Sequence, residues 1–286
     1  MTIAETTYAS LEEVMNTVND LAPLQVVGTR ILQITEGDQF SAHELSQVIA
    51  ADQALTAKML RLSNSAYYSF PRRISTVRDA VVLLGFRAVR SATLASCVIN
   101  TLDEVNALDG DDFWRFSVTV GLAAELLAHT GQGNADEAFT AGVIHNVGLL
   151  AMDQHEPAAL RASHEYAREH GMSLHAAQTI LLGYSDSELG GALALHWNFP
   201  QPLVDAVRDH SPEPGELPEE GSLTAHVVRA RALALSIGYG DGLEATDPTP
   251  LPSEWLDAPL SAALRRAGGV ERMRDRVEAF LTSTLG

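Results

Sequence analysis

The chain has 286 residues, of which 46% are hydrophobic, so it can bury the core of one large domain or of two smaller ones. Nineteen basic residues stand against 37 acidic residues, which gives a formal net charge of −18. A chain this acidic is expected to repel nucleic acid and anionic membrane surfaces. We therefore exclude nucleic-acid binding and membrane binding as its function.

A cytoplasmic location is expected from three features of the sequence. The single cysteine, Cys97, lies in an apolar segment and cannot form an intramolecular disulfide, which is typical of a buried thiol in a reducing compartment. No apolar run approaches the roughly 18 residues that a membrane span requires. The first residues lack the basic start of a signal peptide.

Helices are expected along the whole chain, because apolar residues recur at helical spacing and no stretch alternates between apolar and polar residues. Capping-box patterns at residues 10–13 and 41–44 mark two early helix starts. Loops rich in Pro, Gly and acidic residues are predicted at 211–221 and 241–252. The other expected helices span residues 24–37, 53–63, 76–84, 86–100, 113–129, 136–145, 157–169, 173–182, 187–196, 202–210, 223–237 and 270–285. The fold class predicted by this pattern is all-α.

Residues 52–98 contain the most distinctive pattern, three short helices separated by strong helix boundaries. Asp52 is expected to cap the first helix, and Asn64 to end it in the left-handed conformation that Asn tolerates. Ser75 or Thr76 is expected to start the second helix, which Gly85 ends.

The order of residues in this stretch, LRLSNSAYY followed by ISTVRDAVVLLGFRAVR, resembles the N-terminal signature of the HDOD family. These are bacterial signalling output domains related to the metal-dependent HD phosphohydrolases. The resemblance implies a multi-helix HD-like bundle in two helical subdomains. We expect an N-terminal subdomain over residues 1–110, an HD-like subdomain over 111–215, and a C-terminal extension over 216–286 that packs on the HD-like part.

The resemblance also indicates where the metal site of an HD hydrolase would lie. Such enzymes use dispersed His and Asp residues to bind divalent ions that activate a water molecule. The segment AFTAGVIHNVGLL resembles the one that holds the His-Asp dyad in these enzymes. His145 matches the dyad histidine, but Asn146 stands where the aspartate would be, and an amide is a poorer ligand for a hard cation.

The other ligand positions are altered in the same way. At the position of the family's first metal-binding histidine this chain has Phe116, which cannot ligate a metal. At a second position, where the family has a histidine, this chain has Asp186. Only Asp209 and His210 keep a usable pair. We therefore expect a vestigial site with no catalytic residue, no bound metal and no cofactor; its residues are His145, Asn146, Asp186, Asp209 and His210.

Two other functions stay open for this site. The chain could be a divalent-metal phosphohydrolase that acts on a nucleotide or cyclic dinucleotide, or a metal-free nucleotide sensor in which His145 and Asn146 donate hydrogen bonds. Structural roles are open as well, since His145 and Asn146 could simply end a helix, and His210 could lie on the surface at a helix C-terminus. The histidines at 129, 155, 164, 170 and 175 are expected in solvent, and His196 at a helix end.

Residues 53–102 carry seven basic residues against one acidic residue, whereas the rest of the chain carries 12 basic and 36 acidic residues. Such a concentration of positive charge predicts a surface that binds an anion or an acidic protein partner. The arginines that we favour for this contact are Arg72, Arg73, Arg87 and Arg90. The alternative is that they neutralise the acidic second half of the same chain. The expected function is a regulatory output module that acts through a protein partner.

Overall fold

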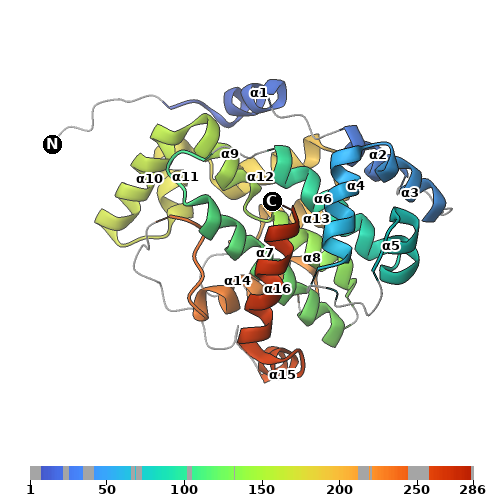
Figure 1. Ribbon diagram of the computed structural model, residues 1–286. Coiled ribbons are helices and arrows are strands. Elements are labelled where there is room, and N and C mark those ends of the chain that lie inside the picture. Colours follow the sequence, from blue (N-terminus) through green and yellow to red (C-terminus); the bar gives the residue numbers. More distant parts are fainter. Residues whose placement is uncertain are drawn as a thin grey trace.

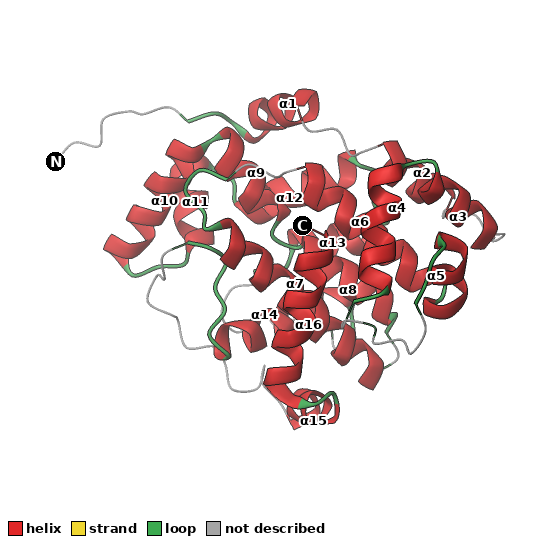
Figure 2. Ribbon diagram, in the orientation of Figure 1, coloured by secondary structure: helices red, strands yellow, loops and turns green. Residues whose placement is uncertain are grey.

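The computed structural model describes residues 8–21, 26–34, 42–65, 68, 73–101, 105–131, 133–211, 219, 221–243 and 258–284. Within these residues all regular structure is helical and no strand occurs (Figure 2). The prediction of an all-α fold is confirmed. None of the described helices is long and apolar enough to span a membrane.

Six helices make up the N-terminal part (Figure 1). The first predicted capping box is present, because Ser10 N and Oγ both donate to Glu13 Oε2 at 2.8 Å. The second begins at Ser41, which lies outside the described residues. The six helices are α1 (Leu11–Leu21), α2 (Val26–Ile34), α3 (Ala42–Ala50), α4 (Gln53–Ser63), α5 (Val77–Leu84) and α6 (Phe86–Thr101).

The boundary between α4 and α5 differs from the expectation at one residue. Asn64 ends α4, but its φ of −96° is not left-handed, so that part of the prediction was wrong. Its side chain instead pairs with the backbone of Ile74: Oδ1 accepts from Ile74 N and Nδ2 donates to Ile74 O, both at 2.7 Å. Thr76 caps α5 and Gly85 ends it, as predicted.

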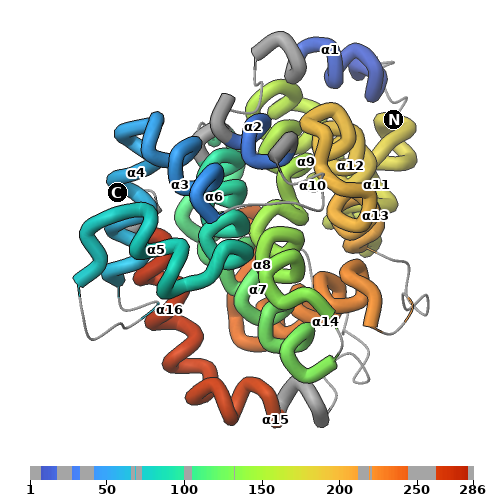
Figure 3. The backbone as a smooth tube through the Cα atoms, turned by 90° about the vertical axis from the view of Figure 1, so that its right-hand side faces the viewer, coloured from blue at the N-terminus to red at the C-terminus, as the bar shows by residue number. Residues whose placement is uncertain are grey.

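The central part contains a long helix, α7 (Gly110–Thr130), paired with α8 (Ala135–Ile144) in the middle of the molecule (Figure 3). Asn134 caps α8 with its side chain, so this helix begins before residue 136, where the sequence predicted its start. The next helix, α9 (Val147–His155), was not predicted; most of its residues are buried, so it lacks the polar face that reveals a helix in sequence. The chain continues through α10 (Pro157–His170), α11 (Leu174–Leu182), α12 (Asp186–His196) and α13 (Gln201–Arg208).

Glycines allow the helices around the α8–α9 turn to approach closely. A Cβ atom on Gly142 of α8 would lie 2.5 Å from the Cα atom of Gly121 of α7. A Cβ atom on Gly148 of α9 would overlap the carbonyl oxygen of Asp186, the first residue of α12. The turn that carries His145 therefore lies directly against the start of α12.

Three further helices close the chain: α14 (Leu223–Ser236), α15 (Ala258–Arg266), which was not predicted, and α16 (Gly269–Thr284). All three pack on α7, and α16 also packs on α4 of the N-terminal part (Figure 1). Arg276 of α16 pairs with Glu125 of α7 at 3.2 Å. Helix α16 contacts both the N-terminal part and the central part, so its contacts do not assign it to either one. The division of the chain into three units stays a prediction.

Candidate functional site

Four of the five predicted site residues gather where α8, α12 and α13 end or begin. His145 ends α8, Asn146 follows it in the turn before α9, Asp186 opens α12, and His210 follows α13. All four are buried, and the two histidines are 0% and 1% exposed. His210 is therefore not the surface histidine that one interpretation placed at the helix end.

The rings of His145 and His210 meet edge to face, with centroids 5.0 Å apart and planes at 90°. Each Nδ1 atom lies 2.6 Å from a backbone carbonyl oxygen, that of Gly142 for His145 and that of Val207 for His210. Because a carbonyl can only accept, each Nδ1 carries the proton and donates it. Both Nε2 atoms are thus lone-pair acceptors, and both are buried without a hydrogen-bond partner among the described residues.

This arrangement changes the role that a nucleotide sensor would give to His145. That hypothesis requires His145 to donate a hydrogen bond to the ligand, but its donor is already used on Gly142. The remaining nitrogen can only accept while the ring is neutral. The side-chain Nδ2 of Asn146, by contrast, is a buried donor without a partner among the described residues.

A residue that the sequence did not reveal lies among these groups: Arg231 of α14. Its Nη1 donates to His210 O at 3.1 Å and to Ser211 Oγ at 2.5 Å. Its guanidinium carbon lies 5.9 Å from the ring centroid of Phe116, a distance at which a cation is attracted to the face of the ring. Arg231 therefore contacts both His210 and Phe116, the residue that the sequence analysis placed at the first histidine position of HD enzymes.

The electrostatics of the site follow from burial and from this guanidinium. Burial is the main reason that the pKa values of His145 and His210 lie well below the usual range for histidine, and the positive charge of Arg231 is the second reason. Both imidazoles are therefore neutral at pH 7. Burial also raises the pKa of Asp186, although Arg231 and then His175 act in the opposite direction. Burial lowers the pKa of Arg231 itself, against the attraction of Asp241 and Asp186.

These residues do not fit a divalent metal. Among the described residues no group of three or more His, Cys, Asp or Glu side chains is arranged to hold one. The ring of Phe116 lies 5.6 Å from that of His145, where it offers no ligand atom. A guanidinium that contacts the same groups would repel a second cation, because like charges repel strongly at low dielectric.

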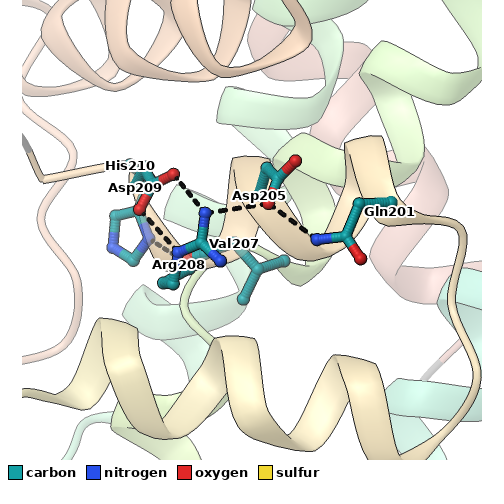
Figure 4. A network of polar contacts seen from close by, with 6 residues as sticks. All are labelled: Gln201, Asp205, Val207, Arg208, Asp209 and His210. Carbon is teal, nitrogen blue, oxygen red and sulfur yellow. Dashed lines mark hydrogen bonds and ion pairs between the residues drawn. The ribbon is translucent and has the colours of Figure 1, made fainter.

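Asp209 does not join the site. Its carboxylate accepts from Arg208 Nε at 2.9 Å and from Arg208 Nη2 at 2.8 Å, and its side chain is 49% exposed (Figure 4). The same Nη2 also reaches Asp205 at 2.8 Å. The structure thus separates the pair expected from sequence, with His210 directed inward and Asp209 outward.

Only two of the five histidines expected in solvent, His129 and His170, are exposed, and His196 ends α12 as expected. His129, His170 and His196 are exposed, while His164 and His175 are half-buried. His155 differs, because its Nε2 atom is buried without a hydrogen-bond partner among the described residues, and burial lowers its pKa.

The predicted basic surface is described in part. Arg72 lies outside the described residues, and Arg73 and Arg87 are exposed. Arg90 is half-buried, with an Nε atom that is enclosed and has no partner in the described part of the chain, so it is not a freely exposed charge. Burial lowers the pKa of Arg90, with Glu137 acting against it. The attraction between Arg90 and Glu137 is in line with the alternative of internal neutralisation for Arg90.

The fold defines a class first: an all-helical bundle of the kind found in HDOD domain structures. The family model for the HDOD domain matches residues 21–212, about two thirds of the chain, and the chain therefore belongs to the HDOD domain family. An uncharacterized protein of Treponema pallidum is 26% identical over 208 residues, which cover 71% of this chain and 40% of that protein.

Solved structures share the fold over most of the chain. An HDOD domain protein of unknown function from Geobacter sulfurreducens is 26% identical with a TM-score of 0.72, covering 96% of this chain and 93% of that one. A Shewanella amazonensis protein provisionally named a phosphohydrolase has 23% identity and a TM-score of 0.71, with 93% and 97% covered. A Marinobacter aquaeolei protein provisionally named a signal transduction protein has 20% identity and a TM-score of 0.75, with 95% and 61% covered.

Proposed function

We propose that this chain is a non-catalytic signalling output module of the HDOD family that acts through protein–protein interaction. The observation that carries the proposal is the guanidinium of Arg231, which contacts the backbone of His210 and the ring of Phe116 within the vestigial site. A fixed organic cation cannot acidify a water molecule as a bound metal does.

The donor set supports the same conclusion. Hydrolysis by an HD enzyme needs ligands that neutralise a divalent ion and a water molecule held on that ion. Here Asn146 contributes an uncharged amide and Phe116 a hydrocarbon ring, and both imidazoles already share their surroundings with a positive charge. The names of similar structures include both a phosphohydrolase and a signal transduction protein. The choice between hydrolysis and signalling without catalysis therefore rests on the site residues of this chain.

The first test measures metal content and hydrolysis on the purified full chain. We expect Fe, Mn, Ni, Co and Zn far below one equivalent. We also expect no metal-dependent cleavage of bis(p-nitrophenyl) phosphate or of a cyclic dinucleotide, and the same result for Asn146→Asp. Stoichiometric metal together with turnover that His145→Ala abolishes would contradict the proposal.

A second test isolates the effect of the arginine. In the triple variant Phe116→His, Asn146→Asp, Arg231→Met, two ligands return and the internal cation is replaced by an uncharged side chain of similar length. We expect this variant to bind Co²⁺, measured by its visible absorption. The double variant Phe116→His, Asn146→Asp, which retains Arg231, serves as the matched control and should bind Co²⁺ much more weakly. Equal binding by the two variants would show that the guanidinium does not block the site.

A further inference from the structure

The candidate site contains polar groups that are buried and have no partner within the described part of the chain. Two of the open acceptors are the lone pairs of His145 Nε2 and His210 Nε2. The third is the carboxylate of Asp186, which accepts no hydrogen bond from another described residue. The open donors are Asn146 Nδ2 and Arg231 Nε. Because a buried polar group without a partner costs stability, a cluster of five needs an explanation.

These five groups lie together. The two imidazole rings have their centroids 5.0 Å apart, and the positive charge of Arg231 acts on both of them and on Asp186. The backbone of Asp186 lies against Gly148, two residues after Asn146. One small molecule can therefore contact groups from the α8–α9 turn, from α12, from the end of α13 and from α14.

The two charged residues of the cluster have opposite signs but do not pair with each other. Arg231 and Asp186 attract one another, yet neither forms an ion pair with any residue that the structure describes. Asp241 also attracts Arg231, again without an ion pair. A simple anion would be attracted by the arginine and repelled by the aspartate, and a simple cation would experience the reverse. A molecule that carries one charge of each sign suits both residues.

We propose that this cluster binds a small zwitterion of the α-amino acid class. An ammonium group has three N–H donors, which match the three open acceptors, namely the two imidazole nitrogens and the carboxylate of Asp186. The carboxylate of the ligand accepts from Arg231 Nε and Asn146 Nδ2. Every one of these hydrogen bonds involves a charged group, which makes it stronger than a neutral one. The net charge of the site does not change on binding.

The exposure of the residues indicates where the ligand enters. Arg231 is half-buried, and so is His175, which acts electrostatically on Asp186 and His210. Since the other residues of the cluster are buried, the ligand enters past these two side chains. A bound amino acid links four helical elements, and its presence can therefore change how they pack. The proposal rests on the proposed function, because it needs a site without metal and adds a small-molecule signal to the output module.

The test is calorimetric titration of the full chain at pH 7 with the common L-amino acids, one at a time. We expect at least one of them to bind in the millimolar range or more tightly. Acetate has only the carboxylate and methylammonium only the ammonium, so each leaves a charge of the site unpaired and should bind far more weakly. The proposal is overturned if no amino acid binds, which leaves water as the occupant. It is also overturned if acetate or methylammonium binds as tightly as the best amino acid.

Variants then locate the binding site. Asp186→Asn and Arg231→Met should each weaken binding by about tenfold or more, because one partner of a buried charged contact is lost. Asp209→Asn is the matched control, since it removes an exposed carboxylate that lies outside the site, and it should leave binding unchanged. Unchanged binding in both site variants would overturn the assignment, and the comparison with acetate and methylammonium holds even if a variant fails to fold.

Failure of this proposal and failure of the proposed function give different results. If no amino acid binds and the purified chain is free of metal and inactive, only the zwitterion site is lost. Stoichiometric metal with hydrolysis would overturn both.

Discussion

Asn64 provides the sharpest test of how the N-terminal helices are held. In Asn64→Ala three hydrogen bonds disappear: Nδ2 no longer donates to Leu60 O or to Ile74 O, and Oδ1 no longer accepts from Ile74 N, each at 2.7 Å. The bond to Leu60 is exposed and water can replace it. The two bonds to Ile74 are partly buried and fasten the end of α4 to the segment that enters α5.

The expected loss follows from those two partly buried bonds. A neutral hydrogen bond contributes a net 0.5–1.5 kcal/mol, and a buried group left unpaired costs about 1–3 kcal/mol. We therefore expect Asn64→Ala to lower the free energy of unfolding by about 2–3 kcal/mol. Asn64→Gly should lose at least as much, because glycine adds backbone entropy to the unfolded chain.

Urea unfolding followed by circular dichroism measures both variants, with Asn198 as the matched control. Asn198 has a φ of +58°, a left-handed conformation. Gly should be tolerated there, while Ala should cost about 1 kcal/mol. At Asn64, where φ is −96°, both substitutions should be costly. If Asn64→Gly is as stable as the unmodified chain, the side-chain bonds to Ile74 do not hold this boundary.

Three further predictions concern the core and the candidate site. Folding lowers the pKa values of His145 and His210, so below pH 6.5 the unfolded chain binds more protons than the folded chain. The free energy of unfolding should therefore fall as the pH drops from 7 to 5. The slope reaches at most about 1.4 kcal/mol per pH unit per histidine. Urea titrations at several pH values measure it, and an unchanged slope in His210→Gln would contradict this origin. Gly148→Ala should cost about 3 kcal/mol or more through overlap with Asp186 O, and near-normal stability in thermal unfolding would show that α9 can shift. Burial raises the pKa of Cys97 to about 12, so its thiol should react with a disulfide reagent at pH 8 only after unfolding, and rapid reaction of the folded chain would argue against its burial.

The sequence by itself was enough for most of the helices, because caps and glycines act within a few residues. Ser10 with Glu13, Thr76 and Gly85 each form the local boundary that their residue types predict. The order of residues in 52–98 was enough to recognise the family, which the family model then matched over residues 21–212. Helix α9 was missed because burial on most sides removes the periodic pattern on which such predictions depend.

The tertiary structure alone decided which polar residues form the site. His210 and Asp209 are neighbours in sequence, but the direction of the chain at the end of α13 turns one inward and the other toward Arg208. Asn64 depends on Ile74, ten residues further along the chain. Arg231 comes from a helix beyond the matched region, and its spacing four residues after the buried Val227 was the one available signal. Arg231 joins His210 and Phe116 only when packing brings α14 against α7, because long-range proximity is not encoded in local sequence.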